Sequence, residues 1–207
     1  FKLKKMITII SYKDDNDITK LISENCDSRI IWGGDKTIEN IREIKLKPHA
    51  NEITFADRYS ISIINTNNII SKKNNSNLTK LIDSFYNDTM IMDQNACSSP
   101  HLVLWLGKNN ERVIEKFWKN FSKKIIRNYN SPDIASLDKY VKICNDITLK
   151  NFKSAKIYDK SLHVVKLKKL DPKLDSLRGK WGYFYEYNIN SLNEIVPFLN
   201  PKYQRLT

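Results

Sequence analysis

The sequence of 207 residues lacks any long hydrophobic run. A membrane-spanning helix needs roughly 18 or more consecutive apolar residues, and the strongest apolar runs here, such as residues 102–106, are only long enough for a strand. No charged segment followed by an apolar stretch, as in a secretory leader, follows Phe1. We therefore predict no membrane span and a location in the cytoplasm.

Cysteine and histidine are both scarce. The three cysteines, Cys26, Cys97 and Cys144, are odd in number, far apart and without a C-x-x-C pair, so neither a disulfide framework nor a zinc site is indicated. A reducing compartment fits this usage. The three histidines form no H-E-x-x-H pattern. We predict no bound metal.

Acidic residues are outnumbered, because 23 Asp and Glu stand against 35 Lys and Arg, for a net charge of +12. Clustered cations bind nucleic acids or anionic surfaces. Here, however, the lysines are scattered among Asn and Ile, the basic pairs are short, and no recognition signature of a nucleic-acid-binding fold is present. We predict no nucleic-acid partner, while a non-catalytic basic binding module remains the alternative function.

The hydrophobic periodicity alternates between strand and helix. With 41% hydrophobic residues, the chain can bury a core. Because helices between strands provide the long crossovers that parallel strands need, the pattern predicts an α/β fold with mainly parallel pairing. We expect strands at 6–11, 28–32, 60–64, 102–106, 163–167 and 181–187, helices at 17–23, 37–44, 78–86, 111–126 and 134–145, and a surface loop at 65–77.

The segment around Cys97 is the most informative for chemistry. Cys97 lies among small and turn-forming residues, which would let a substrate approach. Backbone N–H groups at such a position can stabilise a thiolate and an oxyanion, although an isolated cysteine is more often a small buried hydrophobe. His101 follows four residues later, but Pro100 favours an extended exit, so we expect a structural histidine.

The pair Gly33-Gly34 ends one predicted strand and precedes a helix. Glycines let the backbone approach a ligand closely, and a helix N-terminus favours phosphate, with Asp35 or Thr37 available as the N-cap. A plain tight turn is the alternative, because the full G-x-G-x-x-G fingerprint is missing.

Four ordered blocks carry a family resemblance. The run Gln94-Asn95-Ala96-Cys97 resembles the G-Q-x-C nucleophile segment of the aldehyde dehydrogenase superfamily. Residues 92–102, with blocks at 30–38, 53–60 and 178–184, are similar to the acyl reductases of bacterial luminescence, the LuxC family. The similarity spans nearly the whole chain.

The resemblance implies an aldehyde-dehydrogenase-like α/β fold, with a nicotinamide-binding domain and an α/β catalytic domain around a cleft. We expect the chain to be an internal fragment, with residues 1–70 ending the nicotinamide-binding domain and 71–207 forming an incomplete catalytic domain. Cys97 is then the acyl acceptor, and Gly33 and Gly34 approach the cofactor.

The reaction implied by the resemblance is reduction of a long-chain acyl thioester, or of another activated acyl group, by NADPH to a fatty aldehyde for luciferase. Family members work as oligomers with an acyl-protein synthetase and an acyl-transferase, in a fatty acid reductase complex.

Two departures from the wider superfamily matter. Residues 53–60 occupy the place of a Glu-Leu-Gly-Gly-Lys stretch in hydrolytic members, and no carboxylate there matches their general base; Glu52 and Asp57 are the nearest. Gly179 falls where many members place a ribose-binding Glu. We therefore expect reduction to prevail over hydrolysis.

Overall fold

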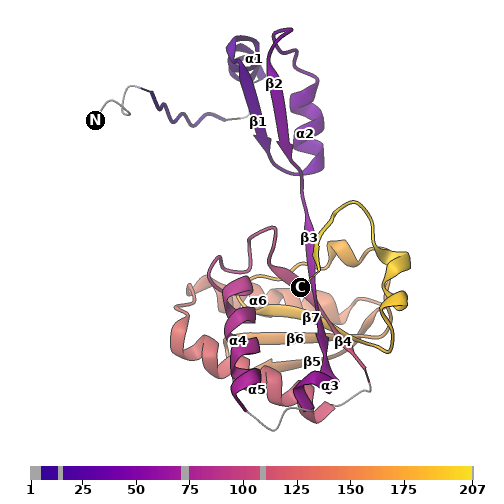
Figure 1. Ribbon diagram of the computed structural model, residues 1–207. Coiled ribbons are helices and arrows are strands. Elements are labelled where there is room, and N and C mark those ends of the chain that lie inside the picture. The colour runs from indigo at the N-terminus through magenta and orange to yellow at the C-terminus, as the bar shows by residue number, and fades with distance from the viewer. Residues whose placement is uncertain (1–5, 14–15, 71–74, 108–110, 207) are drawn as a thin grey trace. The chain divides into compact units, whose positions relative to one another are not determined.

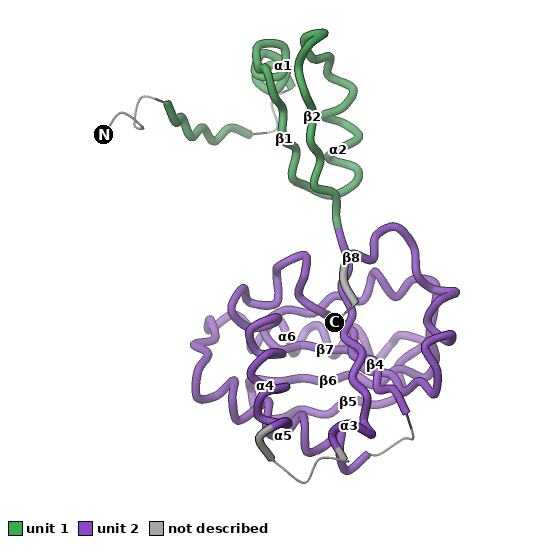
Figure 2. The backbone as a smooth tube through the Cα atoms, in the orientation of Figure 1, with its two compact units in different colours: residues 1–57 green, residues 58–207 purple. Residues whose placement is uncertain are grey.

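The computed structural model describes residues 6–13, 16–70, 75–107 and 111–206. The chain divides into two compact units, residues 1–57 and residues 58–207, which Figure 2 colours separately. No helix in these described ranges is both long and apolar enough to cross a membrane.

The first unit is built on two parallel strands. Strand β1 pairs with β2 from Ser28↔Asn51 to Trp32↔Phe55. The elements of this unit are α1 (Asn16–Asn25), β1 (Ser28–Trp32), α2 (Asp35–Arg42) and β2 (Asn51–Phe55). The strand at 28–32 and the helices on either side of it are confirmed, whereas β2 was not predicted.

The strand expected at 6–11 is wrong, since this segment contains a turn at Met6 and no strand. Its apolar side chains are exposed, with Ile9 at 92%. A β-branched run favours extended backbone. A strand also needs a neighbour for its hydrogen bonds, and none of the described residues pairs with this segment.

The second unit is organised around a six-stranded sheet with the order β5-β6-β7-β4-β3-β8 (Figure 1). All neighbouring pairs are parallel except the antiparallel β5-β6 pair. The strands are β3 (Tyr59–Asn65), β4 (Pro100–Leu106), β5 (Phe152–Tyr158), β6 (Leu162–Leu167), β7 (Tyr183–Ile189) and β8 (Tyr203–Leu206). Its helices are α3 (Thr66–Ile70), α4 (Asn75–Thr89), α5 (Glu111–Asn128), α6 (Ile134–Ile147) and the short 3-10 turns η2 (Leu174–Ser176), η3 (Leu192–Glu194) and η4 (Val196–Phe198).

The two faces of this sheet bury separate cores because side chains alternate along each strand. On β4, Val103 and Trp105 pack with α4 and α5, including the aromatic residues Phe85 and Phe117. Leu102 and Leu104 face the other core, which includes Ile143 of α6 and the C-terminal segments. The sheet is therefore covered on both sides, as expected for parallel pairing.

Two expected boundaries are corrected by local hydrogen bonding. The loop expected at 65–77 contains α3, where the Asn65 side chain accepts a hydrogen bond from Asn67 N at 3.0 Å and so caps the helix. Residues 71–74 lie outside the described part. The strand expected at 181–187 begins later, at Tyr183, because Trp181 and Gly182 have positive φ angles.

The boundary between the two units falls between Asp57 and Arg58, earlier than the expected division at residue 70. The reason is that β3 pairs with β4 and so belongs to the larger sheet. Assignment of the two parts to nicotinamide-binding and catalytic domains stays a prediction.

Candidate active site

Cys97 lies on the connection between α4 and β4, and its side chain is exposed. The backbone around it is fixed on two sides. The hydroxyl of Ser60, on the neighbouring strand β3, donates to the Cys97 carbonyl at 2.7 Å, and the Ser99 hydroxyl donates to Asp88 O at 2.8 Å. The thiol is thus presented on a loop whose backbone is held by the sheet and by α4.

Gln94 ties this loop to the start of β7. Its amide nitrogen donates to Tyr183 O at 2.9 Å and to Pro100 O at 3.3 Å. Its amide oxygen accepts from Gly182 N and Tyr183 N, both at 3.1 Å. The side chain is fully buried, so all four bonds are shielded from water. We call this arrangement the Gln94 clamp.

The clamp requires unusual backbone on both of its sides. Asp93 and Gln94 have φ angles of 54° and 60°, and Trp181 has 54°. Such conformations are uncommon for residues other than glycine and occur where the surroundings enforce them. Trp181 N donates to Asp93 O at 3.2 Å, so the two left-handed segments bond directly to each other.

Glycine is required at two places in the segment that receives Gln94. A Cβ on Gly179 would lie 1.9 Å from Tyr183 O, and a Cβ on Gly182 would lie 2.5 Å from Ser161 O. Gly182 also has a φ of 85°. A glutamate therefore cannot replace Gly179 in this backbone.

Lys139 of α6 supports the same segment from behind. Its side chain is buried, and its ammonium group donates to Lys160 O at 2.7 Å, Ser161 O at 2.9 Å and Trp181 O at 3.0 Å. Burial lowers the pKa of Lys139 to about 8. Lys139 therefore connects α6 to Trp181, whose N–H in turn donates to Asp93 O on the loop that carries Cys97.

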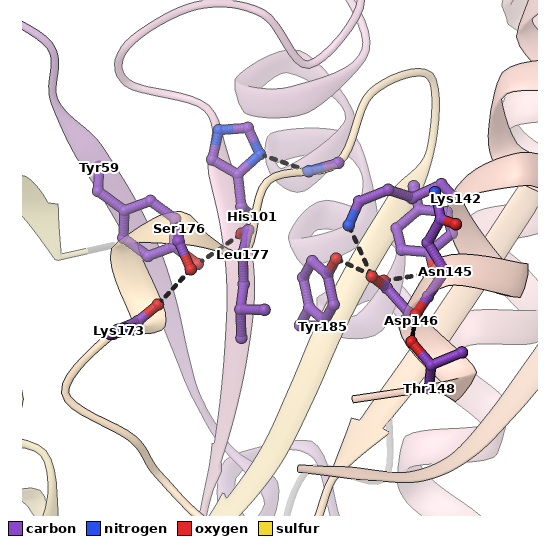
Figure 3. A network of polar contacts seen from close by, with 12 residues as sticks. Tyr59, His101, Lys142, Asn145, Asp146, Thr148, Lys173, Ser176, Leu177 and Tyr185 are labelled. Atoms are coloured by element: carbon purple, nitrogen blue, oxygen red, sulfur yellow. Dashed lines mark hydrogen bonds and ion pairs between the residues drawn. The ribbon is translucent and has the colours of Figure 1, made fainter. Parts of the chain in front are cut away.

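His101 is buried on β4, and its Nδ1 accepts a hydrogen bond from Gly179 N at 3.3 Å (Figure 3). Its ring stacks on Tyr59 with 5.5 Å between centroids. Burial, with a smaller effect of the nearby Arg178, lowers the pKa of His101 to about 4. Among the described residues, no hydrogen bond joins His101 to Cys97. The histidine is neutral near pH 7 and supports Gly179, in agreement with the structural role expected for it.

A second group of buried polar contacts lies beside it in Figure 3. Asp146 of α6 accepts hydrogen bonds from the hydroxyls of Tyr183 and Tyr185 and from Lys142 at 2.7 Å. Burial, followed by the hydrogen bond to Asp146, raises the pKa of both tyrosines. These bonds fix the start of β7 to α6, next to the residues that hold Gln94.

A pocket of about 410 Å³ lies between α6 and the segment before β7. Its lining combines apolar side chains, such as Leu137 and Val141, with the cations Lys142, Arg178 and Lys180. It therefore has the composition to accept a ligand with both apolar and anionic groups.

Gly33 and Gly34 lie in the first unit, between β1 and α2, so the structure does not place them relative to Cys97. Gly34 is the N-cap of α2, in place of the expected Asp35 or Thr37, and it has extended backbone with φ −68°. A Cβ on Gly34 would meet nothing within 4 Å, whereas one on Gly33 would lie 3.2 Å from the Thr37 side chain. Neither backbone nor packing within the described residues requires glycine at position 34.

Glu52 is fully engaged in the first unit. Its carboxylate accepts from Arg42 Nε at 2.8 Å and from Arg29 Nε at 2.9 Å. These hydrogen bonds, from Arg42 first and then Arg29, hold the pKa of Glu52 below its usual value. A carboxylate clamped between two guanidinium groups is a poor general base.

The sequence pointed to Cys97 but not to the side chains that hold it. Gln94 was visible only as part of a motif, and nothing in the sequence marked Lys139 or Ser60 for this role. The one signal in the sequence was the pair of glycines at 179 and 182. Glycines at such spacing indicate that another part of the backbone comes close, but they do not identify that part.

Comparison with known proteins identifies relatives at two levels. The family model described as acyl-CoA reductase (LuxC) matches residues 1–169. A search of the curated proteins by sequence finds no match.

Several aldehyde dehydrogenases have similar structures. Betaine aldehyde dehydrogenase from Staphylococcus aureus, in a form with a BME-modified cysteine, gives a TM-score of 0.55 at 11% identity, over 88% of this chain and 39% of that chain. The same enzyme in complex with NAD⁺ gives 0.53 at 12% identity, over 87% and 39%. A 1-pyrroline-5-carboxylate dehydrogenase from Thermus thermophilus gives 0.57 at 12% identity, over 91% and 39%. At such identities the likeness shows the fold, which is that of the aldehyde dehydrogenases, and the chain spans about two fifths of the length of these proteins.

The Gln94 clamp predicts a specific cost for Gln94→Glu. The substitution keeps the size of the side chain but removes both donated hydrogen bonds and places a carboxylate against two carbonyl oxygens. We expect the free energy of unfolding to fall by about 1–3 kcal/mol, with faster amide exchange in residues 92–99. Asn95→Asp makes the same charge change at an exposed neighbour, and equal effects of the two substitutions would contradict the clamp.

The buried state of His101 predicts a pH dependence of stability. The unfolded chain binds a proton on His101 near pH 6.5, but the folded chain does so only near pH 4. The unfolded state therefore holds more protons between these values, and stability falls as pH decreases through this window. His101→Asn, whose amide oxygen can still accept from Gly179 N, should show a smaller drop in Tm between pH 7 and pH 5. His163, which is also buried, is unchanged in both proteins. An identical drop in Tm would refute the assignment.

Proposed function

The chain belongs to the acyl-CoA reductase (LuxC) family, and we propose that it carries the acyl-accepting cysteine of a long-chain fatty acyl reductase. The observation that carries the proposal is the exposed thiol of Cys97 on a loop that the buried Gln94 clamp holds in place. A fixed loop with an accessible nucleophile is what covalent catalysis needs, because the thiol must meet the acyl carbon in a defined orientation.

The proposed reaction begins with attack of the Cys97 thiolate on the carbonyl carbon of a long-chain acyl thioester or another activated acyl group. The carbon-sulfur bond to Cys97 forms, and the bond to the leaving thiolate breaks as that group leaves with the electron pair. A nicotinamide cofactor, proposed to be NADPH and to be held near Gly33 and Gly34, would supply the hydride for reduction of the acyl carbon. Cys97 would then hold the resulting oxyanion, which gains a proton from water to become a thiohemiacetal. Its collapse breaks the bond to Cys97 and releases a fatty aldehyde, the compound that bacterial luminescence requires.

Backbone N–H groups of the loop are the candidates for stabilising the oxyanion. The N–H groups of Ala96, Cys97 and Ser98 donate no hydrogen bond within the described part of the chain. Donors next to the attacking sulfur that are not engaged elsewhere suit an oxyanion hole, and removal of one such donor typically costs about a hundredfold or more in rate.

The cofactor part of the proposal depends on Gly33 and Gly34. The open space at Gly34 and the start of α2 without a side-chain cap would let backbone N–H groups approach a phosphate of the cofactor. Asp35 in the first turn of α2 has the same charge sign as a phosphate, so binding would depend on the N–H groups. The similar fold of betaine aldehyde dehydrogenase, which has been obtained with NAD⁺, also supports a nicotinamide cofactor.

The remaining parts of the proposal follow from the family. The reductase is an oligomer in the cytoplasm and works in a fatty acid reductase complex with an acyl-protein synthetase and an acyl-transferase. Without a general base at residues 53–60, hydrolysis of the acyl-enzyme is slow relative to reduction.

Cys97→Ser tests the nucleophile. A serine hydroxyl without a dedicated base is a far poorer nucleophile than a thiolate, so the variant should form no acyl-enzyme. Intact-protein mass spectrometry of the full-length protein after incubation with myristoyl-CoA should show one added acyl group in the parent and in Cys144→Ser, the control at the other exposed cysteine. An acyl adduct retained by Cys97→Ser would remove Cys97 from this role.

Gly34→Ala tests the cofactor site. Because an added Cβ has room and the backbone is not left-handed, the variant should keep its Tm within about a degree while a cofactor that approaches the backbone is pushed away. We expect the Kd for NADPH, measured by nucleotide fluorescence, to rise about tenfold or more. Titration with NADH in parallel distinguishes the two cofactors. Unchanged affinity for both would place the cofactor elsewhere.

A further inference from the structure

A groove of about 640 Å³ runs between α4 and α5, and we propose that it docks an acidic amphipathic helix of a partner protein. This inference does not depend on the proposed reductase activity. The lining residues are Leu78, Thr79, Ile82, Asp83, Lys116, Asn120, Lys123, Lys124, Arg127 and Asn128.

The charge of the groove is strongly one-sided. Four of its lining residues are Lys or Arg and one, Asp83, is acidic. Asp83 is already paired with Lys124 at 2.9 Å. Lys123 and Arg127 are exposed, and neither side chain forms an ion pair or a hydrogen bond with any described residue. The groove therefore offers uncompensated positive charge to an anionic partner.

The length of the groove fits a short helix. On α5 the lining residues extend from Lys116 to Asn128, which at 1.5 Å per residue is roughly 18 Å, the length of about three helical turns. The buried side chains of Leu78 and Ile82 form an apolar floor on α4. A helix with apolar residues on one face and carboxylates beside them matches this arrangement of floor and rim.

The lining argues against other anionic occupants. A nucleotide or a single-stranded nucleic acid is usually held by base stacking on aromatic side chains, and none of the ten lining residues is aromatic. A membrane surface would need apolar side chains that protrude and insert, whereas the two apolar lining residues, at 9% and 5% exposure, are recessed below the exposed cations of the rim, where only a ligand that enters the groove reaches them.

A second copy of this chain is also a poor partner. Every α-helix of the described residues that carries Asp or Glu also carries Lys or Arg, so none of these helices is purely acidic. We therefore assign the acidic helix to a different protein and not to the helices described for this chain.

The test is a binding titration of the full chain with a fluorescein-labelled peptide of about 14 residues. The peptide is designed as a helix that carries glutamates on one face and leucines beside them. A peptide of the same composition in scrambled order is the first control. We expect fluorescence anisotropy to show that Lys123→Glu with Arg127→Glu weakens binding about tenfold or more, and that the milder Lys123→Gln with Arg127→Gln weakens it less.

The matched control is Lys168→Glu with Lys169→Glu, which makes the same charge change at two exposed residues between β6 and η2. Support requires that this pair leaves peptide affinity nearly unchanged and that circular dichroism shows all variants folded. Equal weakening by both pairs, or equal affinity for the scrambled peptide, would reduce the effect to net charge and overturn the proposal. Phosphatidylglycerol vesicles and a single-stranded oligonucleotide are tested in parallel. If one of them binds, the groove variant abolishes that binding and the acidic peptide does not bind specifically, the groove is a membrane or nucleic-acid surface and the proposal is wrong.

Discussion

The buried amide of Gln94 is the constraint on which the arrangement around Cys97 depends. One side chain satisfies two backbone donors and two backbone acceptors, on segments nearly 90 residues apart in the chain. In a dry interior each of these groups would cost free energy if left unpaired. The left-handed backbone at Asp93 and Trp181 and the two glycines without room for a Cβ all lie on the two segments that Gln94 joins. The position of Cys97, the proposed nucleophile, is thus determined by the packing of the sheet as well as by its own loop.

The order of the strands in the sheet explains why the Gln94 clamp can form. Strands β4 and β7 are neighbours in the sheet although α5, α6, β5 and β6 separate them in sequence. Because β4 and β7 run parallel, the loop before β4 and the segment before β7 meet at the same end of the sheet, where these two strands begin. Lys139 and Asp146, both on α6, anchor the β7 side of this meeting point. A helix far from the thiol in sequence thereby helps to hold it.

Much of the framework was predictable from local pattern. Residues 102–106 of the buried strand β4 are a continuous apolar run, and α5 has a clear apolar stripe, so the burial of both elements is visible in the sequence. The sequence signal of an edge strand is weaker. Most residues of β5 are exposed, so its sequence mixes polar and apolar residues without a clear strand pattern. At residues 6–11 the prediction fails in the opposite way, because a strand was expected where none forms. The β propensity of this segment does not provide the partner strand that it would need. The clamp was beyond reach because its partners are defined only by tertiary contact, and a glutamine among polar neighbours looks like any solvated residue.

The distance in sequence between Gln94 and Tyr183 also has a consequence for synthesis. Their side-chain to backbone bond spans 89 residues, and a ribosome that adds about 5–20 residues per second needs several seconds to make that length of chain. During this interval Cys97 has already emerged, while the strand that will lock its loop does not yet exist. The thiol is then an unguided nucleophile on a nascent chain, able to react with any oxidant or electrophile it meets. Rapid synthesis of the middle of the chain, or a chaperone that covers its first half, would shorten the time for which this cysteine is exposed before the Gln94 clamp forms.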